Sequence, residues 1–436
     1  MPAFTSAEVG AVRESAERPT VFMYAEDLAA GGYATSFRAR LIHERLSEFG
    51  YDVVTAGLRG RVNGVPSAPA DRPSSSTLRD GLGLLRRAVA AAFSLPDRTV
   101  WASARLAFRA WVGALPRRER DAILVTSPPH TLILAGLSLQ ARSGAALVLD
   151  FRDDWMTNDR IKYRSGVHRG VARAMERLAV RSANAVILNT GVVAAKFAQR
   201  YPESAHKLFV VPNGYDDRDF SGVAVGEAER SPADPIVLGY FGSAYDGFAP
   251  ETFRRLAVRV AEAGLPGRVR LVTGGGGPWD GAGADGVWDH VGSLTEQQAA
   301  AQMSACDALL LLMPPGEREP SGTIPLKAYS YLRSGAFVLY AGERGATTDL
   351  LSAFPRTAFF GRPEVDSIPE WCVLNASRLR PPSVPAGIER FEAREMVGQV
   401  ARIIGESLEA NLARREEGPG PCQPGSAETR GDEECT

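Results

Sequence analysis

The residues best suited to chemistry lie where a turn containing Gly322 is followed by Pro325 and then Lys327. Proline is favoured in the first turn of a helix, and a helix is predicted over Ile324–Ser334, ending at Gly335. The first backbone N–H groups of a helix have no partner within it and carry about half a positive charge. A lysine there adds a full charge, so the pattern predicts that Lys327 binds a diphosphate.

Two more glycine turns are predicted at the carboxyl ends of strands in the same half of the chain. Gly242 follows a strand at 236–241, and a glycine run that begins at Gly274 follows a strand at 269–273. Glycine lets a backbone N–H group come close to an anion. With the lysine, these turns predict a nucleotide diphosphate site, with the base near Val291. Its residues are Gly242, Ser243, Gly274, Gly275, Val291, Gly322, Thr323, Ile324, Pro325, Lys327 and Ser330.

A charged segment from Asp150 to Trp155 follows a buried strand in the first half of the chain. Arg152 is suited to bind a phosphate or carboxylate through two N–H groups. Asp153 is suited to accept a hydrogen bond from a sugar hydroxyl or to orient Arg152. In a doubly wound sheet the ligand crevice opens at the carboxyl ends of the strands, where this segment would lie. We therefore predict catalytic roles for Arg152, Asp153 and the lysine, although one acid could instead cap the next element.

Other polar or glycine positions are expected near the same crevice because each follows a strand. A lone histidine is more often a packing residue and a glycine pair is often only a tight turn, so both interpretations stay open. The predicted binding site for a second substrate comprises Gly31, Gly32, His130, Asp153 and Trp155.

Metal, cofactor and nucleophile chemistry has little support. Asp217-Arg218-Asp219 has a DxD spacing that can hold a divalent metal, but it lies in the connection between the two halves of the chain. No His and Cys cluster has zinc spacing, and no Ser, His and Asp set suggests a nucleophile. The glycine pair lacks the GxGxxG pattern of NAD enzymes. The sequence therefore predicts no metal and no cofactor.

Apolar strand segments that alternate with helical segments would position these residues. In the first half, strands are predicted at 21–24, 52–56, 122–126, 146–150, 185–188 and 208–211. In the second half they are predicted at 236–241, 269–273, 287–290, 308–312 and 337–340. This alternation predicts an α/β fold with two Rossmann-like, doubly wound domains that face a cleft.

At 436 residues the chain is too long for one ordinary domain. We predict a first domain over 18–212 and a second over 213–390, with a helical insertion at 57–120. The insertion has arginine-dotted apolar stretches that fit either solvated helices or a surface for an acceptor or a membrane. The tail at 413–436 is predicted to be disordered because it is rich in Gly, Pro and Glu.

Composition limits the partners. With 50 basic and 51 acidic residues, the formal net charge of −1 gives no case for nucleic acid. Four cysteines without CxxC spacing favour a reduced, cytoplasmic protein. No uninterrupted apolar run approaches the roughly 18–20 residues that span a bilayer. Association with a membrane surface and the oligomeric state stay open.

Four segments resemble the GT-B-fold glycosyltransferases of family 4, the glycosyl transferases group 1, over about Val21 to Leu412. They are Asp150–Trp155, Val211–Asp216 with Phe220, Tyr240–Ser243 and Gly322–Leu339. The first matches an Arg-Asp-x-Trp subgroup of the family, and the last is the most specific of the four.

The resemblance implies retaining, metal-independent transfer of a sugar from a nucleotide diphosphate donor of UDP or GDP type to a small-molecule or glycan acceptor. The second domain would hold the donor and the first the acceptor. Lys327 would stabilise the leaving diphosphate, whose oxygen would take the acceptor's proton. A last helix at 391–412 would cross back to the first domain.

The chain departs from the family pattern at two places. Ser330 stands where many members have a glutamate that holds the ribose, and Tyr245-Asp246-Gly247 stands where an arginine and lysine pair is usual. Stabilisation of the diphosphate would then depend more on Lys327 and Arg152. These departures leave a non-catalytic GT-B partner subunit as an alternative. A sugar-nucleotide 2-epimerase is a second one, although few histidines are available for its acid–base chemistry.

Overall fold

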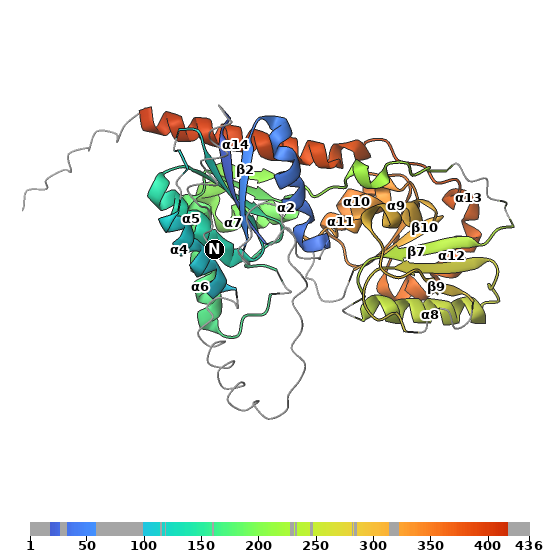
Figure 1. Cartoon of the computed structure of the whole chain (residues 1–436). Helices are drawn as coiled ribbons and strands as arrows, with labels where there is room; N and C mark the ends of the chain where they lie inside the picture. The colour runs from blue at the N-terminus through green and yellow to red at the C-terminus, as the bar shows by residue number, and fades with distance from the viewer. Residues whose placement is uncertain are drawn as a thin grey trace, which may run out of the picture.

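The computed structural model describes residues 18–26, 33–57, 99–113, 116–117, 119–158, 161–226, 231, 233–244, 247–280, 282, 286–313 and 322–416. They form two domains, each built on a six-stranded parallel sheet with helices against it (Figure 1). The predicted α/β class with two doubly wound sheets is confirmed. Gly31, Gly32, most of the predicted insertion and residues 417–436 of the predicted tail lie outside the described residues.

The first sheet has the strand order β2-β1-β3-β4-β5-β6, and its neighbouring strands are parallel. Its central strands are apolar runs buried on both faces, as in parallel sheets that helices cover on both sides. The strands are β1 (Thr20–Ala25), β2 (Asp52–Gly57), β3 (Ala122–Ser127), β4 (Ala146–Phe151), β5 (Ala185–Leu188) and β6 (Leu208–Val210). The helices are α2 (Tyr33–Arg45), α4 (Val100–Val112), α5 (Ile133–Ser143), α6 (Gly166–Ser182) and α7 (Gly191–Arg200), with 3-10 helices η1 (Leu46–Phe49), η2 (His130–Leu132) and η3 (Pro202–Lys207).

The second sheet has the order β12-β11-β10-β7-β8-β9, again with parallel neighbours. Its strands are β7 (Ile236–Phe241), β8 (Val269–Gly274), β9 (Trp288–His290), β10 (Ala308–Leu312), β11 (Phe337–Ala341) and β12 (Thr357–Phe360). The helices are α8 (Phe248–Glu262), α9 (Glu296–Ser304), α10 (Lys327–Arg333), α11 (Ala346–Ser352), α12 (Ile368–Leu374), α13 (Ala376–Leu379) and α14 (Ala393–Glu416), with 3-10 helices η4 (Asp217–Phe220), η5 (Arg362–Ser367) and η6 (Ile388–Phe391).

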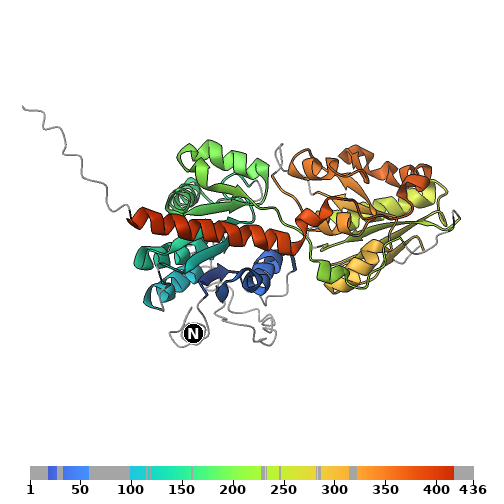
Figure 2. The ribbon, with the colours of Figure 1, turned by 90° about the horizontal axis from the view of Figure 1, so that it is seen from above.

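Helices cover both faces of the first sheet. Buried residues of α4, α5, α6 and α7 share one apolar core with the strands, and those of α2 and α14 share another. Figure 2 shows α14 running from the second domain across the first. Tyr51 donates to the carbonyl of Ala401 at 3.3 Å, and Asn411 donates to that of Gly144 at 3.0 Å.

Two helix boundaries differ from the sequence predictions. The last helix continues to Glu416 instead of ending at 412, because residues 413–416 are Ala, Arg, Arg and Glu, which are good helix formers. The helix predicted from Ile324 begins only at Lys327, so the glycine and proline turn precedes it. Among the described residues, no helix is long and apolar enough to cross a membrane.

Candidate active site

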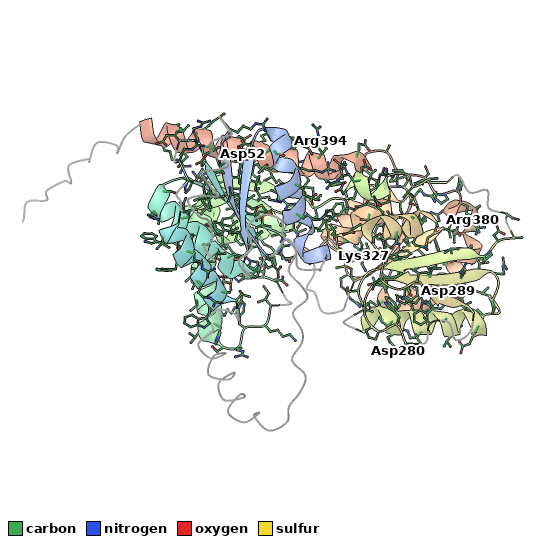
Figure 3. The ribbon with its side chains drawn as sticks, viewed as in Figure 1. Asp52, Asp280, Asp289, Lys327, Arg380 and Arg394 are labelled. Atoms are coloured by element: carbon green, nitrogen blue, oxygen red, sulfur yellow. The ribbon has the colours of Figure 1, made fainter. Side chains whose placement is uncertain are left out.

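The ammonium group of Lys327 lies against the glycine turn that follows β7. Its Nζ atom is 3.7 Å from the centre of the Tyr240 ring, a cation–π contact. A Cβ atom on Gly242 would lie 3.1 Å from the same Nζ atom. Figure 3 shows Lys327 on the side of the second domain that faces the first. The predicted lysine and glycine turn are therefore adjacent in the structure.

The glycine turns after β7 and β8 pack directly on each other. The N–H of Gly242 donates to the carbonyl of Gly274 at 2.9 Å. A Cβ atom on Gly275 would overlap the carbonyl oxygen of Gly242 at 2.2 Å, and Gly275 has φ +127°. The side chain of Val291 closes the same corner, 3.1 Å from where a Cβ of Gly274 would be. The structure thus brings together Gly242, Gly274, Gly275 and Val291.

The backbone N–H groups of two of these glycines already have hydrogen-bond partners within the protein. The N–H of Gly242 is used by Gly274, and the N–H of Gly275 donates to Gly292 at 2.8 Å. The first of these donors is used between the two turns, and the second is used by the segment that follows β9. The glycines therefore provide close packing, and the positive charge at this corner comes from Lys327.

The turn that contains Gly322 touches the first domain. The hydroxyl of Thr190, which caps the start of α7, donates to the carbonyl of Gly322 at 3.0 Å. A Cβ atom on Gly322 would lie 2.8 Å from the side chain of Val193 and 3.9 Å from Nζ of Lys196. Only glycine fits this approach. Sequence reasoning missed Thr190 and Lys196, and the helix-cap pattern of Thr190 was the one signal available for it.

Thr347 is a third residue that the sequence did not single out. Its hydroxyl, at the start of α11, donates to the carbonyl of Thr323 at 2.6 Å. Ile324 and Pro325 continue this turn and are partly buried, whereas Ser243 is exposed. Ser330 lies one turn after Lys327 on α10, so both side chains start from one face of that helix.

In the first domain, Arg152 binds the chain that leaves β3. Its backbone N–H donates to the carbonyl of Ser127 at 2.8 Å, and its guanidinium donates to that of Pro128. Arg152 is 8% exposed, and Glu26 lies 3.8 Å from its guanidinium. Burial lowers the pKa of Arg152, an effect that the nearby carboxylates of Asp150, Asp153 and Glu26 oppose. The arginine predicted to be catalytic is thus held firmly in place.

The three carboxylates of the segment Asp150–Trp155 have different environments. Asp150 is buried in an ion pair with Arg38, at 2.9 Å. Asp154 is buried in an ion pair with Arg200, at 3.2 Å. Only Asp153 of the three is exposed. Asp153 is therefore the one of the three that solvent reaches, and Asp150 and Asp154 hold the segment.

His130 and Trp155 lie inside the domain. Their rings are stacked with centroids 4.7 Å apart, and both residues are at most 5% exposed. Burial, with a smaller effect of the Arg152 charge, lowers the pKa of His130 to about 3, so the imidazole is neutral at physiological pH. Nδ1 of His130 lies 3.2 Å from the hydroxyl of Ser127. This stack supports the segment that carries Asp153, which matches the packing interpretation of the histidine.

No cluster of three or more His, Cys, Asp or Glu side chains in the described parts of the chain could hold a metal ion. Asp217 of the DxD segment begins the 3-10 helix η4 and pairs with Arg333 at 2.7 Å.

Residues 21–214 match the family described as the glycosyl transferase 4-like domain. No curated protein sequence matches the chain. The chain is similar in structure to a sucrose-phosphate synthase from Thermosynechococcus elongatus, with TM-score 0.53, 16% identity, and coverage of 92% of this chain and 99% of that one. It is also similar to an alpha,alpha-trehalose-phosphate synthase (UDP-forming) from Burkholderia vietnamiensis, with TM-score 0.57, 14% identity, and coverage of 90% and 100%. A UDP-GlcNAc 2-epimerase from Methanocaldococcus jannaschii has TM-score 0.52, 8% identity, and coverage of 89% and 99%.

Residues 21–214 are therefore similar to a glycosyl transferase 4-like domain, and the chain as a whole has the two-domain GT-B fold.

Proposed function

We infer that this chain is a retaining glycosyltransferase that moves a sugar from a UDP- or GDP-sugar to a small-molecule or glycan acceptor, without metal or cofactor. The observation that carries the proposal is the position of Lys327, whose ammonium lies between the Tyr240 ring and the Gly242 turn. We place the protein in the cytoplasm, in natural-product or polysaccharide biosynthesis.

The donor diphosphate would bind beside Lys327. The helix α10 has only seven residues, so its dipole is small and the ammonium provides most of the positive charge. Charge develops on the diphosphate as the bond to the sugar breaks, and a fixed cation there stabilises the transition state more than the ground state. Lys196 reaches the Gly322 turn from the first domain and would add a second positive charge beside the diphosphate.

The acceptor would approach from the first domain, next to Asp153. In the transfer, the bond between the sugar C1 atom and the diphosphate oxygen breaks and the acceptor oxygen bonds to C1. The departing phosphate oxygen takes the acceptor's proton. His130 is a poor base for this step because its pKa is about 3. Asp153 would bind a hydroxyl, and Arg152 would fix the segment and add positive charge.

The two alternatives are weaker on this structure. An epimerase needs acid and base groups close to the sugar ring. His130 is buried and neutral, and His290 is stacked on Trp279 with ring centroids 5.3 Å apart. A non-catalytic subunit would have no reason to keep a lysine packed against a glycine turn.

A thermal-shift panel tests the proposal. UDP, GDP, ADP and dTDP are added with and without magnesium to the wild type, to Lys327→Ala and to Lys162→Ala, which replaces an exposed lysine. A ligand at 100 times its dissociation constant adds about 2.7 kcal/mol to the free energy of unfolding. We expect one nucleotide to shift the wild type and Lys162→Ala, independently of magnesium, but not Lys327→Ala. No shift with any nucleotide would favour the non-catalytic subunit.

A further inference from the structure

A cavity of about 430 Å³ lies on the outer surface of the first domain between α6 and η3. Its volume is within the range of roughly 300–1,000 Å³ that ligand sites occupy. Four arginines contribute to its lining: Arg169, Arg173 and Arg177 from α6 and Arg200 from the end of α7. In Figure 1, α6 lies at the lower edge of the first domain. Lys327 and the glycine turns belong to the other domain.

The three arginines of α6 are four residues apart, so they lie on one face of the helix over about 12 Å at 1.5 Å per residue. Like charges at this spacing destabilise a helix. Among the described residues, Arg169 and Arg173 have no ion pair with a carboxylate, and all three side chains are exposed. The face therefore carries positive charge that the described residues leave largely uncompensated.

The remaining wall of the cavity is fixed. Arg200 pairs with Glu176 at 3.2 Å and with Asp154 at 3.2 Å, and its guanidinium lies 4.7 Å over the Phe197 ring. The hydroxyl of Tyr201 donates to Glu176 at 2.8 Å. These carboxylates neutralise the charge of Arg200 within the protein, so the α6 arginines are the ones left to bind a ligand.

The acidic side chain in the described lining interacts with Arg177, while Arg169 and Arg173 have no carboxylate partner among the described residues. Of the described residues that line the cavity, Glu203 is the acidic one, and its carboxylate pairs with Arg181, outside the lining, at 3.3 Å. Met156 and the Tyr201 ring add apolar surface. A site lined by several guanidinium groups and some apolar surface is suited to an organic molecule with anionic groups.

The geometry points to a binding site for a small phosphorylated ligand with at least two anionic groups, held by Arg169, Arg173 and Arg177. Guanidinium groups bind phosphate through paired hydrogen bonds, and the 6 Å step between neighbouring arginines suits two phosphates or a phosphate and a carboxylate. The phosphate belongs either to a soluble ester or to a lipid headgroup. This site goes beyond the proposed transfer reaction and does not depend on it.

The test uses the full-length Lys327→Ala protein, so that the candidate donor site does not contribute. Isothermal titration calorimetry measures the binding of pyrophosphate. Sedimentation measures binding to vesicles of phosphatidylcholine alone or with phosphatidylinositol 4-phosphate, whose headgroup carries two phosphates. The test variant adds Arg169→Gln and Arg173→Gln, and a matched control adds Arg268→Gln and Arg402→Gln, two exposed arginines elsewhere. A further variant, Glu203→Gln, removes the acidic group of the lining.

We expect the double substitution in α6 to weaken binding at least tenfold, the control to leave it unchanged, and Glu203→Gln to strengthen it two- to threefold. Misfolding cannot explain weaker ligand binding in one variant together with tighter ligand binding in another. Binding of pyrophosphate identifies a soluble ligand, and binding only to phosphatidylinositol 4-phosphate vesicles identifies a headgroup. The proposal is overturned if neither probe binds, or if the α6 variant binds as tightly as the control.

Discussion

Arg38 of α2 and Asp150 at the end of β4 form an ion pair of 2.9 Å with both side chains at most 3% exposed. The same guanidinium donates to the carbonyls of Val211 and Pro212, each at 3.0 Å. A single buried arginine thus joins the strand before Asp153 to the chain that leaves the first domain.

Replacing Asp150 with Asn leaves the Arg38 charge buried without its counter-ion. We expect the free energy of unfolding to fall by about 3–5 kcal/mol, measured by chemical denaturation. Asp366→Asn is the control, because it breaks an exposed pair with Arg255 and should cost about 0.2–1 kcal/mol. Equal effects of the two substitutions would show that the buried pair has no special role.

Replacing Lys327 with Ala removes the charge next to the Gly242 turn. Turnover should fall at least 100-fold, about 2.7 kcal/mol of transition-state stabilisation, because the charge acts mainly on the leaving diphosphate. The melting temperature should change little, since this side chain is only partly buried. The assay follows nucleotide diphosphate release once an acceptor is identified. Unchanged turnover would remove the role assigned to this lysine.

Gly275 and Gly264 provide a matched pair for testing the packed turns. Both have positive φ, at +127° and +66°, but a Cβ on Gly264 meets nothing within 4 Å, whereas one on Gly275 overlaps a backbone oxygen. Gly264→Ala should cost about 1–2 kcal/mol from backbone strain alone. Gly275→Ala should cost more and should also abolish the nucleotide-induced thermal shift. If both variants keep that shift, the turns do not shape the donor site.

Stability should depend on pH through His130. The pKa is about 3 in the folded state and 6.5 is the ordinary value, so between these values the unfolded chain binds a proton that the native chain does not. The contribution of neutral His130 is fully present above pH 6.5 and falls as the pH drops, by on the order of 1 kcal/mol per pH unit. In denaturation curves, His130→Gln should flatten this dependence, whereas substitution of the exposed His206 should leave it in place.

The sequence predicted every strand of the two sheets except β12 because buried parallel strands are apolar runs, and β12 was missed because it is short and only one of its residues is buried. It predicted the glycine turns because they follow those runs. It could not separate Asp153 from Asp150 and Asp154. All three are acids at the end of one strand, and the positions of Arg38 and Arg200, far away in the chain, decide that Asp150 and Asp154 are the two buried in ion pairs with these arginines.

Thr190 and Lys196 were missed for a related reason. Each lies on a helix of ordinary composition, and each gains its place only where α7 meets the Gly322 turn of the other domain. The start of α10 was also misplaced, since a proline marks where a helix can begin and does not require it to begin there.

The chain passes between the domains twice, and the two passages are bonded to each other. The N–H of Tyr215 donates to Phe391 at 3.0 Å, and the N–H of Ala393 donates to Tyr215 at 2.8 Å. Gly214 packs so closely on the Phe391 carbonyl that any side chain would overlap it. The connection is therefore a pair of bonded segments and not a single tether. Two bonded segments limit the relative rotation of the domains more than one would, which favours a constant position of Gly322 at the start of α7.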